Sequence, residues 1–171
     1  MKILETERLI LREISSDDAE FVLDLLNQPS FIKYIGDRGV RTLDVARDFI
    51  ENRYRQSYRD HGFGLYTVKL KEADTAVGMC GFVKRDTLPH PDIGFAFLPQ
   101  YGGKGYAVES AQGVMDFGRN VLNFKRVLAL TTPDNQSSGR LLEKIGFKFE
   151  RLLDEPQTDE TLKLYSFDVT D

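Results

Sequence analysis

A glycine-rich segment joins a predicted strand to a predicted helix, and this junction constrains the fold more than any other part of the chain. The segment reads Gln100-Tyr101-Gly102-Gly103-Lys104-Gly105-Tyr106-Ala107 and follows an apolar run that ends near Leu98. From Gly105 to about Leu122 the apolar residues recur at helical spacing. Glycines let backbone N–H groups approach an anion closely, and a helix start adds unpaired donors. The junction predicts a phosphate-binding loop, although such glycines also suit a turn that needs only positive φ angles.

Two well-known nucleotide-binding loops do not fit this segment. A Walker A loop requires Gly-Lys followed by Ser or Thr, whereas Lys104 is followed by Gly105. The dinucleotide fingerprint requires Gly or Ala three residues after Gly105, where this chain has Val108, and it opens a βαβ unit. Here the segment follows three predicted strands joined by short turns, which indicates an antiparallel meander. Spacing and context therefore exclude both loops.

The remaining patterns predict an α/β (mixed α+β) fold with helices on both faces of one sheet. Helices are expected after Ser15, after Thr42, from Gly105 and over about 136–144. Strands are expected over residues 8–14, 64–71, 76–84, 93–98, 126–131, 147–153 and 162–169. Because no repeat, low-complexity tract or flexible linker interrupts these patterns, we expect a single domain over residues 1–171.

Composition excludes several classes of protein. The 23 basic and 27 acidic residues give a net charge of −4, which argues against binding nucleic acid or membranes by bulk charge. The single cysteine, Cys80, excludes an internal disulfide, and the widely spaced His61 and His90 do not suggest a metal site. No apolar stretch approaches the roughly 20 residues that span a bilayer, and Glu5 interrupts any signal peptide. We expect a cytoplasmic monomer or homodimer with no metal.

Four segments of the chain match the signature of one known family, in order. The pattern Gln100-x-x-Gly103-x-Gly105 resembles the pyrophosphate-binding signature of the GNAT superfamily of acetyl-CoA-dependent N-acetyltransferases. Residues 6–12 (TERLILR) are similar to the opening strand of its RimJ/RimL-like branch, and residues 92–99 are similar to the family's fourth strand. Residues 135–147 resemble the motif that follows, whose Asn contacts the pantetheine arm. The resemblance implies the GNAT fold, with about seven mostly antiparallel strands, about four helices, and a splay between strands 4 and 5.

The resemblance also implies where acetyl-CoA binds as co-substrate. Its pantetheine arm is expected between the fourth strand and the strand that begins near Arg126, held by backbone groups of Phe97 and Leu98. Backbone N–H groups of the glycine loop are expected to hold the pyrophosphate, and Lys104 either adds a charge there or is simply solvated. The expected cofactor-binding residues are Phe97, Leu98, Gln100, Gly102, Gly103, Lys104, Gly105, Tyr106, Ala107 and Asn135.

Moving an acetyl group from a thioester to an amine requires a base, donors for the oxyanion and an acid for the thiolate. For the base, Asp92 stands where many relatives have Glu, unless it is a solvated turn residue after Pro91. For the acid, many relatives have a Tyr seven residues after the Asn, and that position is Leu142 here. Ser138 is the candidate in its place, unless it is an ordinary polar residue of the first helical turn.

Other reactive side chains have weaker claims to a role. His90 titrates in a useful range but lies in a Pro-flanked loop, and His61 before a glycine is typical of a turn. Tyr106 is expected to pack at the helix start. Cys80 lies on a predicted central strand, which favours packing over a nucleophilic role. Direct transfer in a ternary complex is therefore expected.

The acceptor side is less constrained by the sequence. The resemblance implies that residues 31–39 and the final hairpin line the acceptor cleft, where Phe31, Tyr34 and Ile35 either cover a substrate or, as is favoured, pack in the core. The expected acceptor is the N-terminal amine of a protein, such as a ribosomal protein, or a small-molecule amine. Two alternatives are a non-catalytic CoA-binding sensor or scaffold module and a phosphate-binding domain unrelated to CoA.

Overall fold

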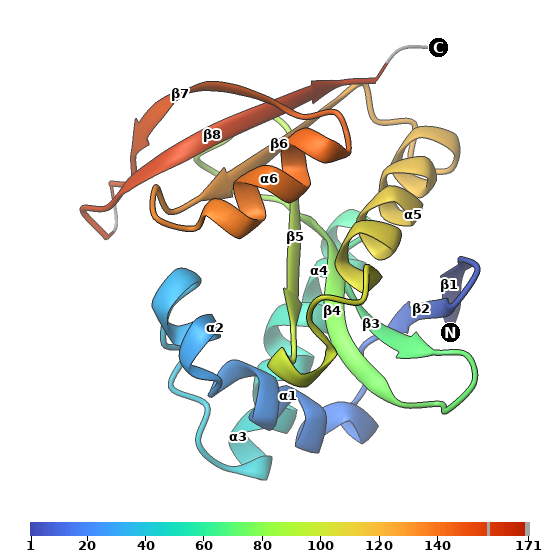
Figure 1. The fold of residues 1–171 in the computed structure, drawn as a ribbon. Helices are drawn as coiled ribbons and strands as arrows, with labels where there is room; N and C mark the ends of the chain where they lie inside the picture. The colour runs from blue at the N-terminus through green and yellow to red at the C-terminus, as the bar shows by residue number, and fades with distance from the viewer. Residues whose placement is uncertain (157, 170–171) are drawn as a thin grey trace.

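A computed structural model describes residues 1–156 and 158–169 of the chain, and it contains one mixed sheet (Figure 1). The sheet has eight strands in the order β1-β2-β3-β4-β5-β6-β8-β7. Their bounds are β1 Lys2–Glu5, β2 Leu9–Glu13, β3 Leu65–Leu70, β4 Ala76–Val83, β5 Asp92–Phe97, β6 Arg126–Thr131, β7 Lys148–Asp154 and β8 Thr161–Asp168. Neighbouring strands are antiparallel except for β5 and β6, which are parallel. The predicted mixed, mostly antiparallel sheet is confirmed.

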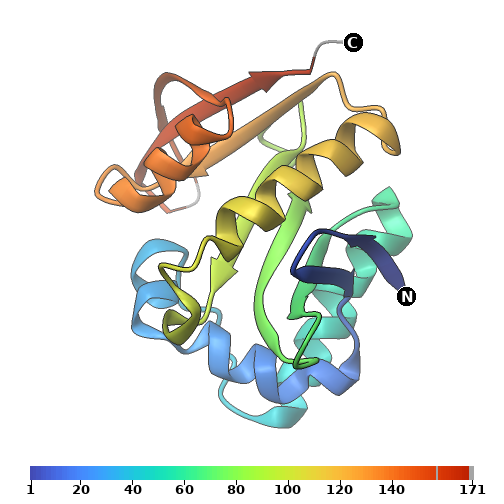
Figure 2. The ribbon, with the colours of Figure 1, turned by 45° about the vertical axis from the view of Figure 1, so that its right-hand side comes forward.

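Helices cover both faces of this sheet. They are η1 Ser16–Asp18, α1 Ala19–Leu26, α2 Pro29–Tyr34, α3 Leu43–Phe49, the π-helical η2 Ile50–Arg55, α4 Gln56–His61, η3 Pro99–Tyr101, α5 Tyr106–Asn120 and α6 Gln136–Lys144. In Figure 2 the yellow helix α5 crosses in front of the central strands. Within the described residues, no helix combines the length and apolar character needed to cross a bilayer.

Strand β5 separates two hydrophobic clusters because successive side chains point to opposite faces. Phe95 and Phe97 pack with the cluster that contains residues of α5, whereas Ala96 and Leu98 pack with the cluster formed by α1 to η2. The same alternation places Asp92 on the face of Ala96 and Leu98, opposite α5. We call this side of β5 the helix α1–α4 face.

Strands β5 and β6 separate soon after they meet. Their pairing has a single register contact, between Asp92 and Leu128, whereas β6 pairs with β8 from Arg126 to Thr131. Figure 1 shows β5 running down from this contact while β6 turns away from it. The predicted splay between these two strands is confirmed, and Asp92 lies at its closed end.

The structure differs from the sequence-based prediction at three elements. Strand β1 adds an eighth strand to the expected seven or so. Pro29 begins α2 as its first residue as well as ending the preceding helix, because its fixed φ suits a helix start. The helix predicted after Thr42 does start there, with the Thr42 hydroxyl accepting from Val45 N at 3.1 Å, but it continues through η2 and α4 to His61.

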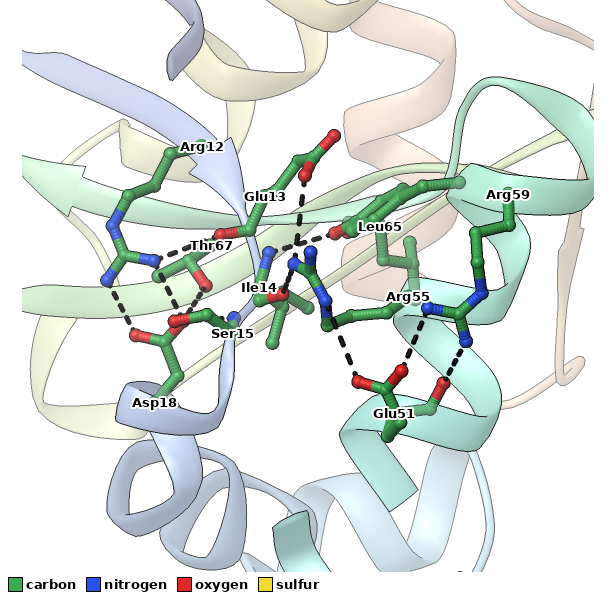
Figure 3. Close-up of polar contacts among 11 residues, drawn as sticks. Arg12, Glu13, Ile14, Ser15, Asp18, Glu51, Arg55, Arg59, Leu65 and Thr67 are labelled. Atoms are coloured by element: carbon green, nitrogen blue, oxygen red, sulfur yellow. Dashed lines mark hydrogen bonds and ion pairs between the residues drawn. The ribbon is translucent and has the colours of Figure 1, made fainter. Parts of the chain in front are cut away.

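A polar network fixes the end of β2 against these helices (Figure 3). Arg12 donates from both terminal nitrogens to Asp18, at 2.8 and 2.6 Å, and Ser15 N donates to the same carboxylate at 2.9 Å. Burial alone would raise the pKa of Asp18, but the bonds from Arg12 and Ser15 outweigh burial and lower it. Asp18 is therefore a paired structural carboxylate.

Two arginines of the helical segment 50–61 belong to the same network. Arg55 donates to the Ile14 carbonyl oxygen at 2.9 Å, and Arg59 donates to Glu51 at 2.8 Å. Glu51 Oε2 also lies 3.7 Å from Arg55 Nε. The Arg55 bond joins the segment to the residue that follows β2, whereas Glu51 links Arg55 and Arg59 within the segment.

Candidate active site

The glycine loop leads from β5 through η3 into α5. Gly103 and Gly105 have φ angles of 74° and 82°, in the left-handed region that favours glycine. A Cβ atom at Gly103 would meet no atom within 4 Å, so the backbone conformation, and not crowding, selects glycine there. Gly105 caps α5, whose first N–H groups have no partner inside the helix. Residues 102–105 are exposed. This geometry suits the binding of an anion.

Arg8, which sequence reasoning missed, stabilises this loop through contacts with Lys104 and Tyr106; we call this set of contacts the brace. Its terminal nitrogen donates to the Lys104 carbonyl oxygen at 2.9 Å, and its guanidinium carbon lies 4.5 Å from the centre of the Tyr106 ring. Glu109 of α5 fixes Arg8 by accepting from Nε at 2.6 Å and from the backbone N at 2.8 Å. Tyr106 therefore packs at the helix start, as predicted. The brace spans about a hundred residues of sequence, so no local spacing indicates it.

The backbone groups of Phe97 and Leu98 differ in availability. Leu98 N donates to the Val77 carbonyl oxygen at 2.9 Å, and the Leu98 carbonyl accepts from Tyr101 N at 3.0 Å. Because bonded pairs alternate along antiparallel strands, the backbone groups of Phe97 turn away from β4, toward the side where β6 diverges. Of the two predicted residues, Phe97 has the backbone groups directed into the splay.

The start of α6 lies beyond the end of β6. Asn135 Oδ1 accepts from Ser138 N at 3.3 Å and so caps the helix, which leaves the amide nitrogen for a ligand. Ser138 is half-buried, and its hydroxyl makes no hydrogen bond with any residue that the structure describes. The Thr132 hydroxyl, which sequence reasoning missed, is buried and also lacks a partner among the described residues. A buried hydroxyl of this kind is costly unless a ligand or water satisfies it.

Asp92 begins β5 and is 2% exposed, so it is a buried strand residue and not a solvated turn residue. Its Oδ1 accepts from Arg85 Nε at 3.0 Å. Burial raises the pKa of Asp92 to about 6, and the positive charge of Arg85 opposes a larger rise. A carboxylate with this pKa is ionised at neutral pH and still basic enough to take up a proton.

The other predicted cofactor residues remain at the loop. The side chains of Gln100 and Lys104 are exposed, and neither has a hydrogen bond or ion pair within the described part of the chain. Gly102 donates its N–H to the Pro99 carbonyl oxygen at 3.0 Å, so this group is already used. Ala107 lies in the first turn of α5. The available backbone donors are therefore concentrated from Gly103 to Ala107.

Cys80, His61 and His90 lie in the kinds of element predicted for them from the sequence. Cys80 is fully buried on β4, and burial raises the pKa of its thiol to about 12, which removes the reactive thiolate at neutral pH. His61 ends α4 with its ring 5.8 Å from that of Phe63, and His90 is half-buried in the loop before β5. The described residues contain no group of three or more His, Cys, Asp or Glu arranged to hold a metal ion.

The aromatic and apolar residues of the segment 31–39 do not share one role. Phe31 packs in the core at 8% exposure, which confirms the favoured prediction. Tyr34 is half-buried beneath Lys33, whose nitrogen lies 4.9 Å from the ring centre. Ile35 is 42% exposed, so the packing prediction is wrong for this residue.

Comparison with known proteins agrees with this arrangement. The family model described as an acetyltransferase (GNAT) domain matches residues 8–148. The chain is 32% identical over 154 residues to the uncharacterized N-acetyltransferase p20 of Bacillus licheniformis, covering 90% of this chain and 86% of that protein. It is 35% identical over 144 residues to the spermidine N(1)-acetyltransferase of Escherichia coli (strain K12), covering 82% and 73%.

The fold also matches that of a solved ribosomal-protein acetyltransferase. RimL, a ribosomal L7/L12 alpha-N-protein acetyltransferase solved in complex with coenzyme A, aligns with a TM-score of 0.85 over 99% of this chain and 98% of RimL. At 16% identity this likeness concerns the fold alone. Together with the family match, it shows that the chain has the GNAT fold. The chain belongs to the GNAT family of acetyltransferases and is an N-acetyltransferase.

Proposed function

We propose that the protein moves an acetyl group from acetyl-CoA directly to a primary amine in a ternary complex. The acceptor is the N-terminal amine of a protein, such as a ribosomal protein, or a small-molecule amine. The observation that carries the proposal is the exposed glycine loop at the start of α5, beside the splay between β5 and β6. The net charge of −4 does not oppose binding of an anionic co-substrate, because the donors are backbone N–H groups.

The glycine loop and the splay suit two different parts of acetyl-CoA, the pyrophosphate and the pantetheine arm. Backbone N–H groups from Gly103 to Ala107 hold the pyrophosphate in this proposal, and Arg8 keeps the loop in place. The Phe97 backbone and the Asn135 amide bind the pantetheine arm between β5 and β6. The unpaired hydroxyl of Thr132 supports this placement, because a polar arm in the splay would satisfy it.

The transfer itself needs three groups, and the site offers one for each. Asp92 lies five residues before Phe97 on β5, about 17 Å along the strand, so it accepts the proton of the ammonium group through a chain of water molecules before the amine nitrogen attacks the thioester carbonyl carbon. As the C–N bond forms, the Phe97 N–H donates to the carbonyl oxygen, where negative charge develops. As the C–S bond breaks, the Ser138 hydroxyl donates its proton to the departing sulfur, which leaves as the CoA thiol, and the serine regains a proton from the now positively charged nitrogen, directly or through water, which leaves a neutral amide.

The buried thiol of Cys80 supports direct transfer. It is the only cysteine of the sequence, it is fully buried, and burial raises the pKa of its thiol to about 12. A thiol in that state cannot act as a covalent carrier near neutral pH. The acetyl group is therefore proposed to pass to the amine without resting on the protein.

Release of CoA thiol from acetyl-CoA, measured with a panel of peptides, polyamines and amino sugars, tests the proposal. We expect amine-dependent thiol release together with an acetylated product in mass spectra. Acetyl-CoA binding without turnover across the panel would instead support a non-catalytic CoA-binding module. Failure of acetyl-CoA to raise the melting temperature at saturating concentrations would leave only a phosphate-binding domain unrelated to CoA.

A further inference from the structure

Tyr165 of β8 places its phenol hydroxyl against the first turn of α6, the helix that begins at Asn135. Tyr165 is 2% exposed, and its ring meets the ring of Phe149 edge-on, with 5.8 Å between the ring centres. A Cβ atom built on Gly139 of α6 would lie 2.7 Å from Tyr165 Oη and 3.7 Å from Cζ. The hydroxyl therefore occupies the space that a side chain at residue 139 would fill, between α6 and β8 (Figure 1).

The contact with Gly139 puts this hydroxyl one helical turn from Asn135. Gly139 N donates to the Asn135 carbonyl oxygen at 3.3 Å, so the two residues are neighbours on one side of α6. Residues four apart on a helix have Cβ positions about 5–6 Å apart. A chain of atoms bound by the Asn135 amide can therefore pass the Tyr165 hydroxyl. Leu142, which follows on the same side of the helix, is 1% exposed and has no polar group to offer.

Thr131 brings a second hydroxyl to the same side of the sheet, at the end of β6. Tyr165 pairs with Ala129 of β6, and Thr131 follows two residues later and so faces the same way. The Thr131 hydroxyl is buried and makes no hydrogen bond with any residue that the structure describes. Burial and the charge of Glu143 raise the pKa of Tyr165, and Thr131 opposes the rise. Tyr165 is thus protonated at neutral pH, and its hydroxyl can donate.

Packing alone does not explain why Gly139 faces a tyrosine. Alanine at residue 139 and phenylalanine at residue 165 would fill the same space with the same number of non-hydrogen atoms, because the alanine methyl group would meet Cζ at 3.7 Å, an ordinary van der Waals distance. Alanine also stabilises a helix more than glycine does, and phenylalanine buries no hydroxyl. The chain has glycine inside the helix and a buried hydroxyl instead. A role for the hydroxyl accounts for both.

We propose that the Tyr165 hydroxyl is a second hydrogen-bond donor to the sulfur of acetyl-CoA, beside the Ser138 hydroxyl. This inference rests on the proposed function. As the C–S bond breaks, negative charge develops on the sulfur, and a phenol O–H group held next to it stabilises that charge. The O–H bond of Tyr165 stays intact, and the proton that the sulfur takes up still comes from Ser138. Ser138 directly precedes Gly139 in the first turn of α6, which brings the two hydroxyls to the same end of the helix.

A double variant that moves one heavy atom from β8 to α6 tests the role of the hydroxyl. Gly139→Ala with Tyr165→Phe removes the hydroxyl and fills its space with a methyl group, so the melting temperature should stay the same or rise. We expect kcat for the best amine of the panel to fall at least tenfold, with KM for acetyl-CoA within threefold. A donor to charge that develops only in the transition state contributes to kcat and little to the binding of acetyl-CoA.

Single variants separate packing from chemistry. Tyr165→Phe should lower kcat as much as the double variant does. Gly139→Ala should lower the melting temperature, because its methyl group would lie 2.7 Å from Tyr165 Oη. The matched control is Tyr66→Phe, which removes a phenol hydroxyl buried in the same hydrophobic cluster but on β3, and which should leave kcat within threefold.

Binding of CoA itself gives a readout that does not depend on turnover. A donor beside the sulfur favours the thiolate, so at about pH 8.5, near the ordinary pKa of a thiol, CoA should bind the unaltered protein severalfold more tightly than the double variant. Desulfo-CoA, which lacks the sulfur, should bind both proteins equally. Isothermal titration measures all four dissociation constants.

Three results would overturn the inference. A folded double variant with kcat within threefold of the unaltered protein would show that the hydroxyl only fills space, and acetyl transfer itself would stand. The same affinity ratio for CoA and for desulfo-CoA would show that the hydroxyl does not meet the sulfur. Acetyl-CoA binding to the unaltered protein with no acetylation of any amine would contradict the proposed function, and the inference would fall with it.

Discussion

The Nε atom of Arg85 lies 3.0 Å from Oδ1 of Asp92, at the point where β5 and β6 begin to separate. Burial by itself favours the neutral acid, and the guanidinium favours the carboxylate. The balance raises the pKa of Asp92 to about 6. Asp92 is therefore ionised near neutral pH at the closed end of the splay, as a proton acceptor for the amine must be.

Replacing Asp92 by Asn removes the proposed proton acceptor with little change in shape. We expect kcat to fall at least about 100-fold, which is a typical contribution of a general base, with acetyl-CoA affinity unchanged. In the unaltered protein, kcat/KM should rise with pH through about pH 6, as Asp92 loses its proton. Steady-state kinetics from pH 5 to pH 8 measure both effects. A kcat within threefold of the unaltered protein would remove Asp92 from the mechanism.

The same carboxylate makes stability depend on pH. The pKa of Asp92 is about 6 in the folded protein, above the unfolded value of about 3.9, so the folded state binds more protons between these values. Its contribution to the free energy of unfolding is thus fully present below about pH 4 and is lost as pH rises through 6, by roughly 2–3 kcal/mol. Urea unfolding at pH 4.5 and pH 7 should show that Asp92→Asn removes this loss. An identical pH dependence in both proteins would refute it.

Gly103→Val tests the loop, with Gly62→Val as its matched control. Both glycines have left-handed φ angles, 74° and 78°, and at both positions a Cβ would meet open space. Each change should therefore destabilise the fold by the same amount, about 1–2 kcal/mol. Only Gly103→Val should raise KM for acetyl-CoA, by about tenfold or more. If both variants retain normal affinity, the glycines are structural and the loop does not bind the pyrophosphate.

Arg8 is a positioning residue for the same loop. Arg8→Ala removes the bond to the Lys104 carbonyl and the contact over Tyr106. We expect KM for acetyl-CoA to rise severalfold with kcat little changed, and Arg8→Lys to restore only part of the loss, because a lysine cannot replace the planar fork. Isothermal titration with CoA separates this from a general loss of stability. An unchanged dissociation constant for folded Arg8→Ala would show that the brace serves the fold alone.

Ser138→Ala tests the proposed acid, and Ser137→Ala is its neighbour control. The Ser138 hydroxyl is free of partners among the described residues, and Ser137 is an exposed residue of the same helical turn. Loss of the donor to the departing sulfur should lower kcat about tenfold without changing KM for acetyl-CoA, and Ser137→Ala should change neither. Equal activity of the two variants would leave the thiolate to be protonated by solvent.

Elements with local signals could be predicted from the sequence almost to the residue. Strand β6 and helix α6 have the predicted bounds, because the Asn135 cap and Gly146, with a φ of 107°, mark the helix ends. Strand β1 has only four residues and is defined by its register with β2, and such tertiary pairing leaves little local trace.

The candidate site also contains parts that have a local sequence signal and parts that do not. The glycine loop and the Asn135–Ser138 turn are continuous in sequence, so their spacing could be recognised. Arg8 reaches the glycine loop from a part of the chain that only the fold brings close to it, and no local spacing indicates this. The burial of Asp92 was also hidden, because Pro91 and the polar loop before it resemble an exposed turn.

Amine-dependent release of CoA thiol, followed alongside the intact mass of the protein, is the decisive test of direct acetyl transfer from acetyl-CoA to an amine. We expect purified protein to release thiol from acetyl-CoA only when an acceptor amine is present, with one acetylated amine formed per thiol and the mass of the protein unchanged. Thiol release that acetylates the protein before any amine is added would contradict direct transfer. Tight acetyl-CoA binding without turnover of any amine would contradict the proposed transfer itself.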